Sequence, residues 1–267
     1  MTPQSCKEQV SNPKREMRLD FFRSIVILRK KTYNQTVGSY LGFVWLILDP
    51  LILTMVYLFV FSVIAHREEP AMLFAGLGII RGLQRSLLTS SSPAFLKSQG
   101  GFPIERIRTR VTVASSVMIV ATDSFFMGIG ISGVLIYLGT DPLNSLAYVV
   151  ILFASNLWWH SLGICLLIIT VRVPDVHKLL MYFGMGMFFI SPVLYSFNLT
   201  SGLHRLICIY NPATYFIEFS RFITQTQTGV NDLPQIGFFA VPILGVLMLI
   251  SGAFQMDKIR WNSSNRS

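Results

Sequence analysis

Six long runs of hydrophobic residues alternate with shorter polar segments along most of the chain. An α-helix needs about 20 apolar residues to cross the hydrocarbon core of a bilayer, which is about 30 Å thick. We therefore predict an all-α integral membrane protein with six transmembrane helices. The predicted spans are residues 43–65, 71–92, 111–138, 146–171, 179–197 and 236–254.

The composition agrees with this class. Hydrophobic residues make up 52% of the 267 residues and charged residues 13%, whereas an ordinary soluble domain carries about 25% charged residues. So little charge excludes an intrinsically disordered chain and argues against a water-soluble enzyme. The spans divide the chain into a cytoplasmic N-terminal segment (1–42), a six-helix transmembrane domain (43–256) and a cytoplasmic tail (257–267).

The net charge of +9 would favour a nucleic-acid partner in a soluble protein. Here the position of the charges gives a different explanation. With the N-terminus inside, the inner segments hold seventeen Lys and Arg, and the outer segments hold Arg67, Arg205 and Arg221. Positive charge gathers in cytoplasmic loops, so we predict that both termini are cytoplasmic and that nucleic acid is no partner.

Three segments outside the spans carry their own patterns. Residues 14–33 combine regularly spaced apolar residues with basic ones, which predicts an amphipathic helix lying in the membrane interface. Residues 97–110 pass through a Gly-Gly break to Pro103 and several arginines, which indicates a short cytoplasmic helix or a solvated basic loop. Residues 198–235 predict two short outer helices that turn back toward the membrane and break at Asn211-Pro212.

The second span carries a polar stripe at helical spacing. An arginine at the centre of a membrane helix costs about 2.5–3.5 kcal/mol, so the stripe must face protein, a polar cavity or water. It either lines a path for an anionic or polyhydroxyl cargo or forms ion pairs with Asp49, Asp123 or Glu218. The stripe consists of Arg81, Gln84, Arg85, Leu88, Thr89 and Ser92.

The spans also carry aromatic residues that could contact a cargo, and the sequence lacks several common catalytic motifs. Phe125, Trp158, Trp159 and Tyr195 are candidates for stacking against sugar rings, with helix packing and interfacial belting as the alternative. The chain has no phosphate-binding GxxxxGK[ST] loop, no metal motif and no cluster of nucleophile and base. We therefore expect no catalytic residue, no metal site and no cofactor on this chain.

Several motifs follow one another in the order found in type 2 ABC transporter permeases, and the chain resembles this family over nearly its whole length. Within the family it is most similar to polysaccharide exporters of capsule, O-antigen and teichoic acid, and the segments 102–104 and 218–221 favour the capsule branch. The matching residues are Leu41, Gly42, Trp45, Leu48 and Pro50, then AGL at 75–77, VPDVHK at 173–178, ISPVLY at 190–195, and Asn211, Pro212, Glu218 and Arg221.

The resemblance implies a half-transporter in the bacterial inner membrane. Two copies would form the pore, and two separate ABC ATPase subunits, which bind ATP and Mg²⁺, would drive export of a lipid-linked polysaccharide. Periplasmic and outer-membrane export proteins are further candidate partners. Arg81 departs from many relatives, which carry an apolar or aromatic residue there, and this departure favours an acidic glycan.

The resemblance also assigns roles to residues. The interface helix would include Arg15, Arg18, Phe21, Phe22 and Ile25; the ATPase-coupling helix would include Pro103, Ile104, Glu105, Arg106 and Arg108; and the outer gate would include Asn211, Pro212, Glu218 and Arg221. The candidates for the substrate channel come from the polar stripe, the acids and the aromatic residues of the spans: Arg81, Gln84, Arg85, Asp49, Asp123, Phe125, Trp158, Trp159 and Tyr195. The alternatives are a small-molecule exporter of the same fold, a membrane-embedded glycan or lipid enzyme, and a scaffold for a synthesis complex.

Overall fold

The computed structural model describes residues 13–36, 44–60, 70–93, 95, 109–226 and 228–264. These residues form helices and their connections, without a strand. The prediction of an all-α fold is therefore confirmed for the described part of the chain.

The helices follow the predicted segments in order. The amphipathic segment forms α1 (Pro13–Thr36). The six predicted spans correspond to α2 (Val44–Phe59), α3 (Pro70–Ser91), α5 (Thr109–Tyr137), α6 (Pro142–Arg172), α7 (Asp175–Ile190) and α10 (Gln235–Ser264). The predicted outer segment contains η2 (Phe197–Leu199), α8 (Gly202–Tyr210), α9 (Pro212–Ile223) and η3 (Val230–Asp232), so the predicted break at Asn211-Pro212 is confirmed, while a return of these helices toward the membrane stays a prediction.

By length and composition, four of the described helices can cross a membrane: α3, α5, α6 and the part of α10 from Gln235 to Met256. The helices α2 and α7 have 16 residues each, or roughly 24 Å. Helix α7 ends at Ile190, before the extended Ser191, because Pro192 cannot continue the helix. The count of six spans stays a prediction.

The turn between α5 and α6 shows how local sequence sets an element boundary. Gly139 adopts a φ of 92°, which is accessible to a residue without a Cβ. The Asp141 carboxylate accepts hydrogen bonds from the backbone N–H groups of Leu143 and Asn144, and Pro142 occupies the first turn of α6. Capping by Asp followed by Pro is a strong start signal, and it reverses the chain within four residues.

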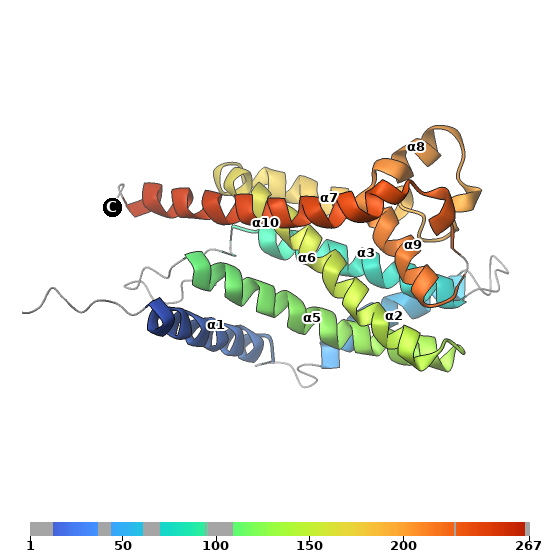
Figure 1. Cartoon of the computed structure of the whole chain (residues 1–267), viewed down its shortest axis with the longest axis horizontal. Helices are drawn as coiled ribbons and strands as arrows, with labels where there is room; N and C mark the ends of the chain where they lie inside the picture. Colours follow the sequence, from blue (N-terminus) through green and yellow to red (C-terminus); the bar gives the residue numbers. More distant parts are fainter. Residues whose placement is uncertain are drawn as a thin grey trace, which may run out of the picture.

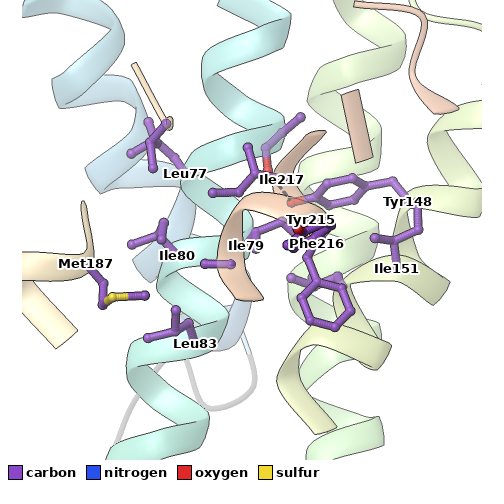
Figure 2. Close-up of a cluster of buried hydrophobic side chains, with 14 of the residues drawn as sticks. Leu77, Ile79, Ile80, Leu83, Tyr148, Ile151, Met187, Tyr215, Phe216 and Ile217 are labelled. Carbon is purple, nitrogen blue, oxygen red and sulfur yellow. Dashed lines mark hydrogen bonds between the residues drawn. The ribbon is translucent and has the colours of Figure 1, made fainter. Parts of the chain in front are cut away.

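Helix α3 lies at the centre of the molecule and packs against α2, α5, α6, α7 and α9. Residues 72–80 of this helix are all buried. Figure 2 shows Leu77 and Ile80 on the side of Met187, and Ile79 on the side of Phe216 and Tyr148. The core around the first half of α3 is therefore filled by apolar side chains from several helices.

Glycines bring α3 and α6 close together. A Cβ added at Gly78 would overlap the hydroxyl group of Tyr148, and one added at Gly82 would overlap the side-chain amide of Asn156. The Tyr148 hydroxyl donates a hydrogen bond to the carbonyl of Ala75 over 3.0 Å. Small residues four apart allow membrane helices to approach closely, and Gly78 and Gly82 have this spacing.

The two ends of the molecule differ in what they carry. The start of α1 and the end of α10 lie at the left end of Figure 1, and α8 and α9 lie at the right end. The described parts of the predicted terminal segments therefore lie opposite α8 and α9, and the orientation in the membrane stays a prediction.

Candidate functional site: a polar cavity on one face of α3

The polar stripe forms the open face of α3. Among residues 72–91, five side chains are partly or fully exposed and all the others are buried. The five are Arg81, Gln84, Arg85, Leu88 and Thr89. Because they follow the helical repeat, they lie on one side of the helix, and the transition from a buried helix to an open one occurs at Arg81.

A cavity of about 360 Å³ lies against this face. Arg81, Gln84, Arg85 and Leu88 of α3 line one side of it. The other lining residues are Met127 of α5 and Met181 and Met185 of α7. The cavity therefore combines two guanidinium groups with flexible apolar thioether side chains, a lining suited to an amphiphilic molecule.

Arg81 and Gln84 form a short hydrogen-bonded chain that reaches α7. The Arg81 Nη1 donates to the Gln84 Oε1 over 3.2 Å, and the Gln84 Nε2 donates to the carbonyl of Gly184 over 2.9 Å. A Cβ added at Gly184 would come within 3.3 Å of the Gln84 Cγ, so glycine keeps room for this contact. Both ends of the Gln84 amide are used, which fixes its orientation.

Arg85 is paired with an acid on the neighbouring helix. Its Nε lies 3.4 Å from the Asp123 Oδ2 of α5, and the side chains are 36% and 22% exposed. Of the three predicted partners, Asp123 makes this pair, Glu218 pairs elsewhere, and the side chain of Asp49 lies outside the described residues. The alternative of a structural ion pair therefore holds for Arg85. The described side-chain contact of Arg81 is a hydrogen bond to the neutral Gln84 instead.

A second cavity, of about 10 Å³, lies behind the Arg85–Asp123 pair. Its lining includes Lys31 of α1 and His160 of α6, and a volume of this size accommodates about one water molecule. Burial lowers the pKa of the Lys31 ammonium group; the nearby Asp123 opposes this shift, and Arg85 adds to it. Asp123 thus lies between cations from α1 and α3.

His160 is held by packing contacts. Its ring lies 3.0 Å from the Ser116 hydroxyl and packs edge-on against Phe95. Among the described residues, no group of His, Cys, Asp and Glu side chains could hold a metal ion.

The predicted outer-gate residues form a buried network. The Asn211 Oδ1 accepts a hydrogen bond from the Ala213 N–H at the start of α9, and its Nδ2 donates to the Ser191 hydroxyl over 2.8 Å. Pro212 is the first residue of α9. Asn211 therefore joins α9 to the chain that follows α7.

Glu218 and Arg221 form an ion pair of 3.0 Å in which neither side chain is exposed. Arg221 also donates to the carbonyls of Val193 and Tyr195. Glu218 accepts hydrogen bonds from the N–H groups of Phe197 and Gly229 and from the Thr228 hydroxyl. The pair thus links α9 to residues 193–197 and to residues 228–229. These hydrogen bonds satisfy the two buried charges, as the stability of a buried ion pair requires.

The aromatic candidates do not gather at the larger cavity within the chain. Trp158 and Trp159 are buried in the core, and the Trp158 Nε1 donates to the carbonyl of Val241. Phe125 is 53% exposed and packs edge-on against Phe126. The Tyr195 hydroxyl meets the His204 Nε2 at 2.7 Å in the outer segment.

The predicted interface helix packs on α5 through a face that mixes polar and apolar residues. Ser24 is buried there and its hydroxyl donates to the carbonyl of Val111 over 3.3 Å, while Ile27, Leu28 and Lys31 are partly buried. The predicted residues face away from this contact: Arg15, Arg18, Phe21, Phe22 and Ile25 are all exposed. Basic and apolar side chains together on an exposed face agree with a helix at a lipid interface.

The predicted coupling residues lie outside the described residues. They are Pro103, Ile104, Glu105, Arg106 and Arg108.

Three features of the site escaped the sequence analysis. The pair Gly78 and Gly82 had a readable spacing of four. The methionines Met127, Met181 and Met185 and the cation Lys31 had no local signal, because they come from helices that are distant in sequence. Their association depends on how α1, α5 and α7 pack around α3.

No family model matches the chain. A curated relative, the O-antigen export system permease protein RfbA of Klebsiella pneumoniae, is 22% identical over 247 residues, which cover 89% of this chain and 92% of the relative. This similarity supports the predicted resemblance to polysaccharide-export permeases at a coarse level. It also agrees with the prediction of a transport permease that is not itself an enzyme. With the four apolar helices, it indicates a multi-pass membrane protein.

Proposed function

We propose that this chain is the transmembrane subunit of an ATP-driven ABC exporter that moves a lipid-linked polysaccharide outward across the bacterial inner membrane. The observation that carries the proposal is the similarity to an export permease over 89% of the chain. The open polar face of α3 fits this role, because a saccharide needs hydrogen-bonding groups along its path. ATP would be hydrolysed with Mg²⁺ on a separate subunit.

The cargo is proposed at two levels. A lipid-linked polysaccharide is the class that the relative and the family motifs support. Capsular polysaccharide is the candidate favoured by the segments 102–104 and 218–221, and O-antigen is the second candidate, favoured by the name of the relative. A teichoic-acid or small-molecule exporter of the same fold is a further alternative.

In the proposed assembly, two copies of the chain form the pore and two ABC ATPase subunits bind on the cytoplasmic side. Residues 103–108 would dock on the ATPase, and six spans would cross the membrane in each copy. The network around Glu218 and Arg221 would hold the outer segment over the pore. The exposed side of α1 would rest on the inner lipid surface. Periplasmic and outer-membrane export proteins are candidate partners beyond this core.

The first test is an affinity pull-down of the detergent-solubilised chain from its native membrane, followed by an assay of ATP hydrolysis. We expect an ATPase subunit in equal amount with the chain. A chain that purifies alone after gentle solubilisation would contradict the proposal and favour the membrane-enzyme or scaffold alternatives. Deletion of the gene, with separate staining of capsule and of lipopolysaccharide, then distinguishes the two cargo candidates.

The coupling assignment has its own test. Arg106→Glu and Arg108→Glu should abolish export while ATP hydrolysis by the assembly persists, because reversed charge disrupts docking without touching the nucleotide. Arg172→Glu, which changes an exposed arginine at the end of α6, is the matched control and should export normally. Unchanged export by the first two variants would show that the coupling site lies elsewhere.

A further inference from the structure

The two arginines of the cavity differ in how their charge is balanced. Arg85 is 3.4 Å from the Asp123 carboxylate, so one positive charge has an acidic partner. The described hydrogen bond of the Arg81 side chain goes to the neutral Gln84. Among the residues whose side chains are described, the carboxylate of Asp123 therefore balances Arg85, and Arg81 contributes a net positive charge to the cavity, which attracts an anion.

The Arg81 guanidinium is also held in place. Gln84 accepts from the Arg81 Nη1 and donates to the Gly184 carbonyl, so α7 fixes the amide and the amide fixes the guanidinium. A guanidinium has five N–H donors, and one hydrogen bond leaves several of them for a ligand. Its Nε is buried and has no hydrogen-bond partner among the described residues.

The walls around Arg81 specify more than charge. Met181 and Met185 stand one turn apart on α7, Met127 faces them from α5, and all three line the same cavity. Unbranched thioether side chains adapt to irregular apolar groups. The cavity of about 360 Å³ therefore offers a positioned cation beside a deformable apolar wall.

We propose that Arg81, positioned by Gln84, binds an oxyanion of the cargo, and that the three methionines receive the apolar or ring portion next to it. This inference rests on the proposed function and adds a ligand chemistry to it. A phosphate at the lipid end and a carboxylate on a sugar are two sources of the same oxyanion. Arg85 is assigned a different role, in which Asp123 holds it in the wall between α3 and α5.

The test uses the full chain in nanodiscs of neutral lipid and titration calorimetry. Dodecyl phosphate represents a phosphate with an apolar chain, trigalacturonate a sugar carboxylate, and dodecyl maltoside the uncharged control. We expect saturable binding of one of the two anions, weakened by added salt, and no comparable binding of dodecyl maltoside. Binding of dodecyl phosphate assigns the oxyanion to the lipid end, and binding of trigalacturonate assigns it to the glycan.

Three variants locate the binding on Arg81. Arg81→Gln removes the charge. Gln84→Glu leaves Arg81 intact but puts a carboxylate where the Gln84 Oε1 now lies, 3.2 Å from the Arg81 Nη1. Each should weaken anion binding roughly tenfold or more, the effect of one charge-assisted hydrogen bond. Arg205→Gln, on the outer helix α8 and stacked over Phe197, is the control and should bind like the wild type. Gel filtration and thermal unfolding verify that each variant is folded.

Equal anion affinities of the folded wild type and Arg81→Gln would overturn the inference, and so would the absence of binding for both anions. Either result leaves the proposed function standing if the ATPase still co-purifies with the chain. If the chain binds an anion but no ATPase subunit co-purifies with it, the proposed function is overturned instead.

Discussion

At the scale of single residues, neighbours of the same type have different environments. Arg81 and Arg85 are four residues apart on one face of α3, yet one contacts an amide and the other a carboxylate. Arg221 shows the opposite extreme, because it is fully buried and bonded to Glu218 and two carbonyls. The partner, rather than the arginine itself, decides whether the charge is available to a ligand.

The buried pair in the outer segment is predicted to be essential for stability. Glu218→Gln leaves the Arg221 guanidinium buried without its carboxylate, a loss of about 3–5 kcal/mol in the free energy of unfolding. Thermal unfolding in detergent measures it as a lower melting temperature. The control is Asp175→Asn, which breaks an exposed pair with Lys178 and should not change the melting temperature. An unchanged melting temperature for Glu218→Gln would contradict the assigned role.

We predict that Arg85 and Asp123 are energetically coupled in folding and that Arg81 and Asp123 are not. A double-mutant cycle with Arg85→Gln and Asp123→Asn should give an interaction energy of about 0.5–3 kcal/mol, as for residues in contact. The cycle with Arg81→Gln and Asp123→Asn should give less than about 0.5 kcal/mol. Chemical unfolding of the purified chain provides both values. Equal coupling in the two cycles would show that the arginines share the carboxylate.

At the scale of elements, α3 changes character along its length. Its first half, residues 72–80, is buried on all sides, and from Arg81 onward one face is open. Gly78 and Gly82 hold it against α6, which leaves the opposite side to face α7 and the cavity. Helix α1 packs on α5 through a mixed face, in which Ser24 is buried and Ile27, Leu28 and Lys31 are partly buried, whereas the predicted interface residues are exposed.

The close approach of α3 and α6 makes Gly82 intolerant of a side chain. Gly82→Ala places a Cβ on the side-chain amide of Asn156, and such overpacking costs about 1–3 kcal/mol. Gly133→Ala on α5 is the matched control, because a Cβ there meets nothing within 4 Å and alanine favours a helix by up to about 1 kcal/mol. Melting temperatures should fall for the first variant and stay equal or rise for the second. Tolerance of Gly82→Ala would mean that the two helices separate easily.

At the scale of the whole molecule, the two ends are chemically distinct. The start of α1 and the end of α10 share one end of the molecule, and the Glu218–Arg221 network lies near α8 and α9 at the other. The polar cavity begins where the buried half of α3 ends. In the proposed orientation the cavity lies in the cytoplasmic half of the molecule.

This orientation is predicted to place the C-terminus in the cytoplasm. A green fluorescent protein fused after Ser267 should fluoresce, because the excess of Lys and Arg keeps that end inside. Alkaline phosphatase fused at the same position should be inactive, and the same enzyme inserted after Thr200, before α8, should be active. An active phosphatase at the C-terminus would reverse the assigned topology.

The sequence alone determined the helical class, the order of the helices, most of their boundaries, the break at Asn211-Pro212 and the polar stripe on α3, because these depend on hydrophobic runs, prolines and spacing within one segment. The tertiary structure decided which arginine is paired, which side of α1 packs, and which methionines share a cavity with Arg81. These outcomes depend on contacts between helices that lie far apart in sequence, such as Asp123 with Arg85 and Gly184 with Gln84. Periodicity predicts that a face is polar, but the neighbouring helices decide whether that face meets an acid, an amide or open space.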